Sequence, residues 1–114
     1  MQEPSGRCEA RFTRRYDATV EDVWHALTDP QSLERWLAPP AGVTLTRAEP
    51  EHVLELDWSP AGEPPSVVRI ELRADGERTV LVLEHSRIDA ALGMRYMRDW
   101  ARALERFDRQ RRQT

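Results

Sequence analysis

Alternation of apolar and polar residues is the first pattern along this chain, and it predicts β-strands. From Val67 to Arg73, apolar side chains take every second position and charged side chains alternate with them, as expected of a strand with one buried face. Together with similar runs, this pattern predicts five strands, at residues 11–16, 43–47, 53–58, 67–73 and 79–85. Asp75-Gly76 predicts a tight hairpin between the last two, and the short connections make neighbouring strands antiparallel.

A second pattern, with the period of an α-helix, predicts two short helices after the first strand. Thr19 is placed to cap the first helix, with Asp22 three residues later in the capping-box position. Asp29-Pro30 ends this helix and begins the second, because Asp is a good N-cap and Pro is tolerated at the first helical position. Pro39-Pro40 then stops the second helix, whose buried side is expected to carry Leu33, Trp36 and Leu37.

One long helix, from about Ala90 to Arg112, is predicted at the end of the chain. Its apolar side carries Tyr96, Trp100, Leu104 and Phe107, and a stripe of arginines lies nearly opposite, at Arg95, Arg98, Arg102, Arg106 and Arg109. Such amphipathicity predicts that one side packs against the sheet. The stripe resembles a solvated helix face more than a nucleic-acid surface, because the chain has a pI near 5.6 and the stripe contains no aromatic residue.

These elements define an α+β protein. We expect an antiparallel meander sheet of about five strands, curved around the long C-terminal helix, with two short helices after the first strand. A chain of 114 residues has the size of one domain. We place that domain at residues 11–112 and expect residues 1–10 to form a flexible N-terminal tail.

Composition excludes several classes of protein. The chain is 39% hydrophobic and 32% charged, which is typical of an ordered globular domain, and no apolar run approaches the roughly 18 residues of a membrane span. The N-terminus lacks the apolar stretch of a secretory signal, so we expect a cytoplasmic protein. Cys8 and three scattered histidines form no zinc pattern, so neither metal nor cofactor is expected. All 17 basic residues are arginine, which indicates a GC-rich, bacterial genome.

The order of elements and several local motifs resemble the START-like (SRPBCC) superfamily and its helix-grip fold. The motifs are Tyr16-Asp17-Ala18, Glu21-Asp22-Val23-Trp24, Ala26-Leu27-Thr28-Asp29-Pro30, Arg35-Trp36-Leu37, and Glu84-His85-Ser86 ahead of the helix that contains Trp100. They are similar to the branch of homologues of the activator of heat-shock-protein ATPase, over about residues 11–107. The chain departs from that branch where residues 39–42 replace a strand pair, which would shorten the wall around the long helix, and where Asp99 replaces a frequent glycine.

The resemblance implies a space between sheet and long helix that receives a small apolar molecule. The expected wall residues are Trp36, Leu56, Trp58, Ile70, Leu83, Met97 and Trp100, with Leu54 and Met94 as further candidates. Aliphatic members of this set are equally expected of a simple core. Tryptophan and methionine side chains suit a ligand surface as well as a core, so both interpretations stay open for them.

Three polar residues share the expected inward side of their strands: Arg14, Arg47 and His85. A charge directed into an apolar space is costly unless it is paired. Such residues therefore either bind a ligand carboxylate or phenol, or bend out to solvent and to neighbouring acids. His85 has a third option, because an imidazole can act as a base near neutral pH or simply hold the last helix.

Three functions are consistent with these features. The first is binding of a small hydrophobic or aromatic molecule, without catalysis, by the residues Trp36, Arg47, Leu56, Trp58, Ile70, Leu83, His85, Met97 and Trp100. The second is an enzyme like polyketide cyclases and aromatases, in which His85 or Arg47 polarises a carbonyl. The third is a protein-interaction module like the co-chaperone relatives. An open sheet edge at Val43 would also allow a homodimer, and neither nucleic acid nor membrane is an expected partner.

Overall fold

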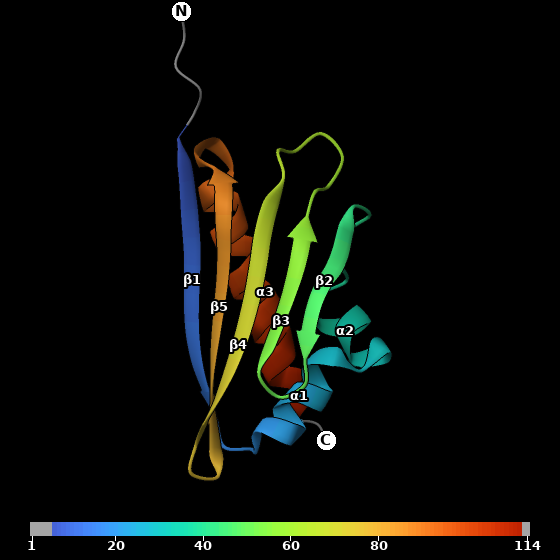
Figure 1. The fold of residues 1–114 in the computed structure, drawn as a ribbon, viewed down its shortest axis with the longest axis vertical. Helices are drawn as coiled ribbons and strands as arrows, with labels where there is room; N and C mark the ends of the chain where they lie inside the picture. Colours follow the sequence, from blue (N-terminus) through green and yellow to red (C-terminus); the bar gives the residue numbers. More distant parts are fainter. Residues whose placement is uncertain (1–5, 113–114) are drawn as a thin grey trace, which may run out of the picture.

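The computed structural model describes residues 6–112 and has one five-stranded antiparallel sheet with a long helix against one face (Figure 1). In chain order the elements are β1 (Arg7–Tyr16), α1 (Val20–Thr28), α2 (Pro30–Trp36), β2 (Val43–Glu49), β3 (Val53–Trp58), β4 (Ser66–Asp75), β5 (Arg78–Asp89), a short 3-10 turn (Ala90–Leu92) and α3 (Gly93–Arg112). The strands lie in the order β1-β5-β4-β3-β2. The predicted α+β helix-grip architecture is confirmed.

The first strand begins earlier than predicted. β1 starts at Arg7, which pairs with Asp89 on β5, and Ala10 is buried in the core. The expected flexible tail is therefore wrong for residues 7–10, because the end of β5 is long enough to pair with them. Residues 1–5 of that tail lie outside the described residues.

Both short helices begin at the predicted caps. The Thr19 hydroxyl accepts a hydrogen bond from the backbone N–H of Asp22, at 3.2 Å. The Asp29 carboxylate accepts one from the backbone N–H of Ser32, also at 3.2 Å, with Pro30 at the first helical position. These bonds satisfy backbone donors that the first turn of a helix leaves unpaired.

The apolar stripe of α3 is buried against the sheet and α2. Tyr96, Trp100, Leu104 and Phe107 are each at most 5% exposed. Phe107 meets the ring of Trp36 edge-on, with 5.3 Å between ring centroids, and the Trp36 indole N–H donates to the Leu27 carbonyl at 3.2 Å. This end of the molecule is thus a closed aromatic core.

No helix in residues 6–112 is long and apolar enough to cross a membrane.

Strand β2 contains an irregularity that changes which side chains face inward. Leu45 pairs with Leu56, but Arg47 already pairs with Glu55, so one extra residue is accommodated at Thr46. From that point Ala48 takes the inward side, and Arg47 takes the outer side with Glu55. The expected inward direction of Arg47 is wrong because strict alternation does not continue through a bulge.

The connection from α2 to β2 is short, and β2 forms the edge of the sheet (Figure 1). Gly42 allows this entry into β2: its φ is +95°, and a Cβ there would collide with the backbone carbonyl of Ser59. Only glycine adopts this conformation without strain. The strand pair expected of the family is absent between α2 and β2, so no strand covers this edge in residues 6–112.

Candidate functional site

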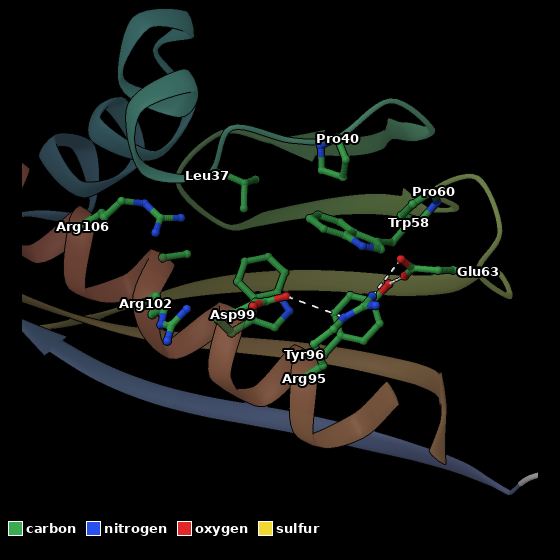
Figure 2. Close-up of a pocket in the computed structure, with 12 residues that line it drawn as sticks. Leu37, Pro40, Trp58, Pro60, Glu63, Arg95, Tyr96, Asp99, Arg102 and Arg106 are labelled. Carbon is green, nitrogen blue, oxygen red and sulfur yellow. Dashed lines mark hydrogen bonds and ion pairs between the residues drawn. The ribbon is translucent and has the colours of Figure 1, made fainter. Parts of the chain in front are cut away.

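A groove of about 380 Å³ opens between α3 and the sheet, at the end where β3 leads into the β3–β4 loop (Figure 2). Helix α3 supplies one wall, from Arg95 to Arg106. Trp58 at the end of β3 supplies the opposite wall, and Leu37 with Pro40 lies across from the middle of the helix. The groove is therefore built mainly from α3 and from the end of β3.

Aromatic rings form the floor of the groove. Trp58 is 7% exposed and Trp100 is 2% exposed, and their ring centroids are 5.3 Å apart. The Tyr96 ring lies beside them, one turn before Trp100 on α3. Rings at this spacing stabilise one another beyond simple burial, so the floor is a preformed apolar surface.

His85 lies directly behind this floor and is fully buried. The Trp100 indole N–H donates to His85 Nδ1 at 2.8 Å. Because an indole nitrogen can only donate, Nδ1 must accept and the ring proton must be on Nε2. His85 Nε2 therefore donates to Ser66 Oγ, with 2.7 Å between the two atoms. The Ser66 hydroxyl donates in turn to the Trp58 carbonyl at 3.2 Å. One directional chain of hydrogen bonds therefore joins α3, β5, β4 and β3.

The protonation of His85 follows from its burial. Removal from water lowers the pKa of His85 to about 4, and the carboxylate of Glu63 opposes this shift only in part. The imidazole is thus neutral at pH 7, which the hydrogen bond from Trp100 also requires. Both ring nitrogens are occupied, so the predicted option in which His85 ties down the last helix describes its geometry in this structure.

A polar cluster closes the end of the groove near the β3–β4 loop. Glu63 accepts a hydrogen bond from the Tyr96 hydroxyl. It also forms an ion pair with Arg95, with 2.8 Å between the charged atoms. Arg95 also lies 4.0 Å from Asp99. Burial acts to raise the pKa of Glu63, but the bonds from Tyr96 and Arg95 outweigh it, so this pKa is lowered. Burial and the hydrogen bond to Glu63 raise the pKa of Tyr96 to about 12, which keeps its phenol neutral.

One donor in the groove has no acceptor. Trp58 Nε1 is buried and makes no hydrogen bond with any described residue. It lies near enough to the Tyr96 phenol to lower the pKa of Tyr96 slightly, but the two groups do not meet the geometry of a hydrogen bond. An unpaired buried donor costs about 1–3 kcal/mol, so an acceptor in the groove would be stabilising.

The structure brings together part of the predicted wall. Trp58 and Trp100 line the groove, and His85 supports them from behind. Ile70 and Leu83 are core residues with at most 1% exposure. Trp36 is also fully buried, but it packs against Phe107 rather than lining the groove.

Three predicted residues lie elsewhere. Arg47 is on the outer side of β2 and pairs with Glu49 and with Glu55, the latter at 3.3 Å, and both acids raise its pKa. Met97 is 43% exposed on α3 and does not line the groove. Leu56 borders a second cavity of about 320 Å³, an apolar one between strands β2–β3 and helices α1–α2.

Sequence reasoning missed the polar members of the groove. Glu63 belongs to a loop rich in proline and glycine, where no period shows which way a side chain points. Arg95, Arg102 and Arg106 had been assigned to a solvated stripe, yet they line the groove because its opening lies along the edge of the buried face. Tyr96 was predicted to be buried, and its hydroxyl becomes polar lining only through the contact with Glu63.

Arg14 does not line the groove. Its guanidinium lies over the Phe12 ring, 5.4 Å from the centroid, and donates to the Thr13 carbonyl at 3.1 Å. This half-buried guanidinium therefore stays beside its own strand.

Comparison with solved structures shows similarity over nearly the whole chain. CalU16 from Micromonospora echinospora is 27% identical with a TM-score of 0.77, covering 92% of this chain and 82% of its own. Protein MLL2253 from Mesorhizobium loti is 22% identical with a TM-score of 0.81, covering 94% and 98%. The Aha1 dimer from Colwellia psychrerythraea is 16% identical with a TM-score of 0.70, covering 85% and 90%. No protein-family model and no curated protein matches the sequence.

The neutral state of His85 predicts an acid-sensitive fold. In the unfolded chain, this histidine takes up a proton near its ordinary pKa of 6.5. In the folded protein, its pKa is about 4, so it stays neutral down to that pH. The unfolded state therefore binds more protons in this range, and the free energy of unfolding should fall as the pH drops from about 6.5 to about 4, by at most about 3 kcal/mol from this group.

Urea unfolding near pH 7 and near pH 5 measures this contribution. We expect a smaller pH-dependent loss in His85→Gln than in the wild type, even though the variant is less stable at both pH values. His25→Gln is the matched control, because His25 is exposed, and its loss should equal that of the wild type. Equal losses in all three proteins would contradict the assignment.

Proposed function

Because the chain is a small START-like (SRPBCC) domain with the helix-grip fold, we propose that it binds a small hydrophobic or aromatic molecule in the groove between β3 and α3. The observation that carries this proposal is the buried Trp58 indole N–H, which lacks an acceptor among the described residues, on a floor of aromatic rings. A bound molecule with an acceptor atom in the plane of the indole, in line with the N–H bond, would satisfy that donor.

The rest of the interior supports the same location. Trp36, Leu83 and His85 lie between sheet and helix at 0% exposure, so side chains occupy this part of the interior. An empty apolar cavity of about 300 Å³ would cost about 7 kcal/mol, a large share of the stability of a small domain. The groove avoids this cost because it is open to solvent.

A cyclase-like activity has less support. Such an activity would need His85 or Arg47 to polarise the carbonyl of a substrate. Both ring nitrogens of His85 are engaged, with Trp100 and Ser66, and Arg47 lies outside the groove. Binding without covalent chemistry therefore agrees better with this arrangement.

N-phenyl-1-naphthylamine, a neutral aromatic amine whose fluorescence rises in apolar sites, is a suitable first probe. We expect saturable binding to the wild type and binding at least about tenfold weaker to Trp58→Ala, because the variant removes a ring of the aromatic floor. In ¹⁵N-resolved spectra, the indole N–H signal of Trp58 should move on titration. The signal of Trp36 should stay in place, because its N–H is bound to the Leu27 carbonyl.

Leu45→Ala is the control variant for the second cavity, which Leu45 lines. It should bind the probe as the wild type does. A probe affinity that Trp58→Ala leaves unchanged, or that Leu45→Ala abolishes, would contradict the proposed site.

Self-association is a second candidate function, supported by the exposed edge strand. Every residue of β2 from Thr44 to Glu49 is exposed, and Leu45 keeps 54% of its surface accessible beside the apolar cavity. An uncovered edge offers unpaired backbone groups to another strand. Two copies of β2 related by a two-fold axis would run antiparallel and would cover Leu45 in both. The solved Aha1 structure from Colwellia psychrerythraea is described as a dimer.

Sedimentation equilibrium tests this association. We expect a mass of twice 13.3 kDa at high protein concentration, and a monomer for Leu45→Glu, because a charge at the centre of the interface is costly to bury. Met94→Glu is the control, since Met94 is 85% exposed on α3 and its replacement should leave the dimer intact. A wild-type protein that stays monomeric at high concentration would rule the dimer out.

A further inference from the structure

We infer that the ligand of this groove is an aromatic anion, a ring system that carries a carboxylate or similar oxyanion. This inference rests on the proposed function and adds the charge of the ligand to it. It follows from the distribution of satisfied and unsatisfied polar groups along the groove.

The two ends of the groove differ in their charge. At the end near the β3–β4 loop, the carboxylates of Glu63 and Asp99 both pair with Arg95, and Glu63 also accepts from Tyr96 (Figure 2). Both acids of the lining are thereby engaged with a single cation. This end needs no further charge from a ligand.

The opposite end of the groove carries two arginines one helical turn apart, Arg102 and Arg106. Arg106 uses its Nε–H to donate to the Trp36 carbonyl, at 3.1 Å, which fixes the side chain and leaves its terminal nitrogens for another partner. Arg102 makes no hydrogen bond or ion pair with any residue in the described part of the chain. With three arginines and two acids, the lining has an excess of one positive charge.

Three side chains in the groove lining have donors without acceptors. Trp58 Nε1 and the guanidinium groups of Arg102 and Arg106 can donate but cannot accept. A ligand that satisfies them must supply acceptor oxygens, and an oxyanion also neutralises the excess charge. Guanidinium groups bind carboxylates and sulfonates with paired, charge-assisted hydrogen bonds. The aromatic floor between the two ends of the groove would pack against the ring system of the ligand.

A matched pair of probes separates charge from ring. 1-Anilinonaphthalene-8-sulfonate is N-phenyl-1-naphthylamine with an added sulfonate, so the two dyes share one ring system and differ by one negative charge. We expect the wild type to bind the sulfonate about tenfold or more tightly than the neutral dye, with the Trp58 indole signal moving in both titrations.

Arg102→Gln tests the source of that preference. The variant should weaken sulfonate binding about fivefold or more and leave binding of the neutral dye unchanged. Arg109→Gln is the control, because Arg109 is exposed on the same helix outside the groove, and it removes the same charge from the protein. The control should bind both dyes as the wild type does.

The outcomes distinguish the two proposals. Equal affinity of the wild type for the two dyes, with the Trp58 signal moving in both cases, would overturn the anion inference and leave the proposed groove standing. The anion inference would also be overturned if Arg109→Gln weakened sulfonate binding as much as Arg102→Gln does. Failure of both dyes to move the Trp58 signal would overturn the proposed function and the inference together.

Discussion

The hydrogen bond from the Trp100 indole to His85 Nδ1 is the constraint on which the rest of this structure depends. It joins the middle of α3 to the central part of the sheet, at 2.8 Å, and it fixes the imidazole in its neutral state with the proton on Nε2. That proton in turn positions Ser66, and Ser66 binds the carbonyl of Trp58. The floor of the groove is therefore held by a polar chain behind it, which also sets the distance between helix and sheet.

This chain has a consequence for where a ligand is able to bind. In a helix-grip fold the space between sheet and helix is available in principle, but here it is filled by buried rings and aliphatic side chains around His85. Next to α3, the groove lies at the open end, where Trp58 and Trp100 present their faces. A short chain thus keeps a dense, stable core and offers its aromatic surface at the rim.

The sequence predicts most of the fold, because alternation and helical period report directly on burial. His85 and Trp100 were both expected to point inward, and they do. Their mutual hydrogen bond was not predictable, since it depends on the register of α3 against β5. Arg47 was misplaced because one bulge residue changes the alternation. Glu63 was missed because its loop has no period, although its contacts with Tyr96 and Arg95 define one end of the groove.

The protonation pattern of His85 is the most direct test of this account. Long-range ¹H–¹⁵N spectra at neutral pH distinguish a ring nitrogen that carries a proton from one that accepts a hydrogen bond. The account predicts a protonated Nε2 and an unprotonated Nδ1 in the folded protein, with the Nδ1 signal shifting in Trp100→Phe. A proton on Nδ1, or a positively charged ring at neutral pH, would contradict it.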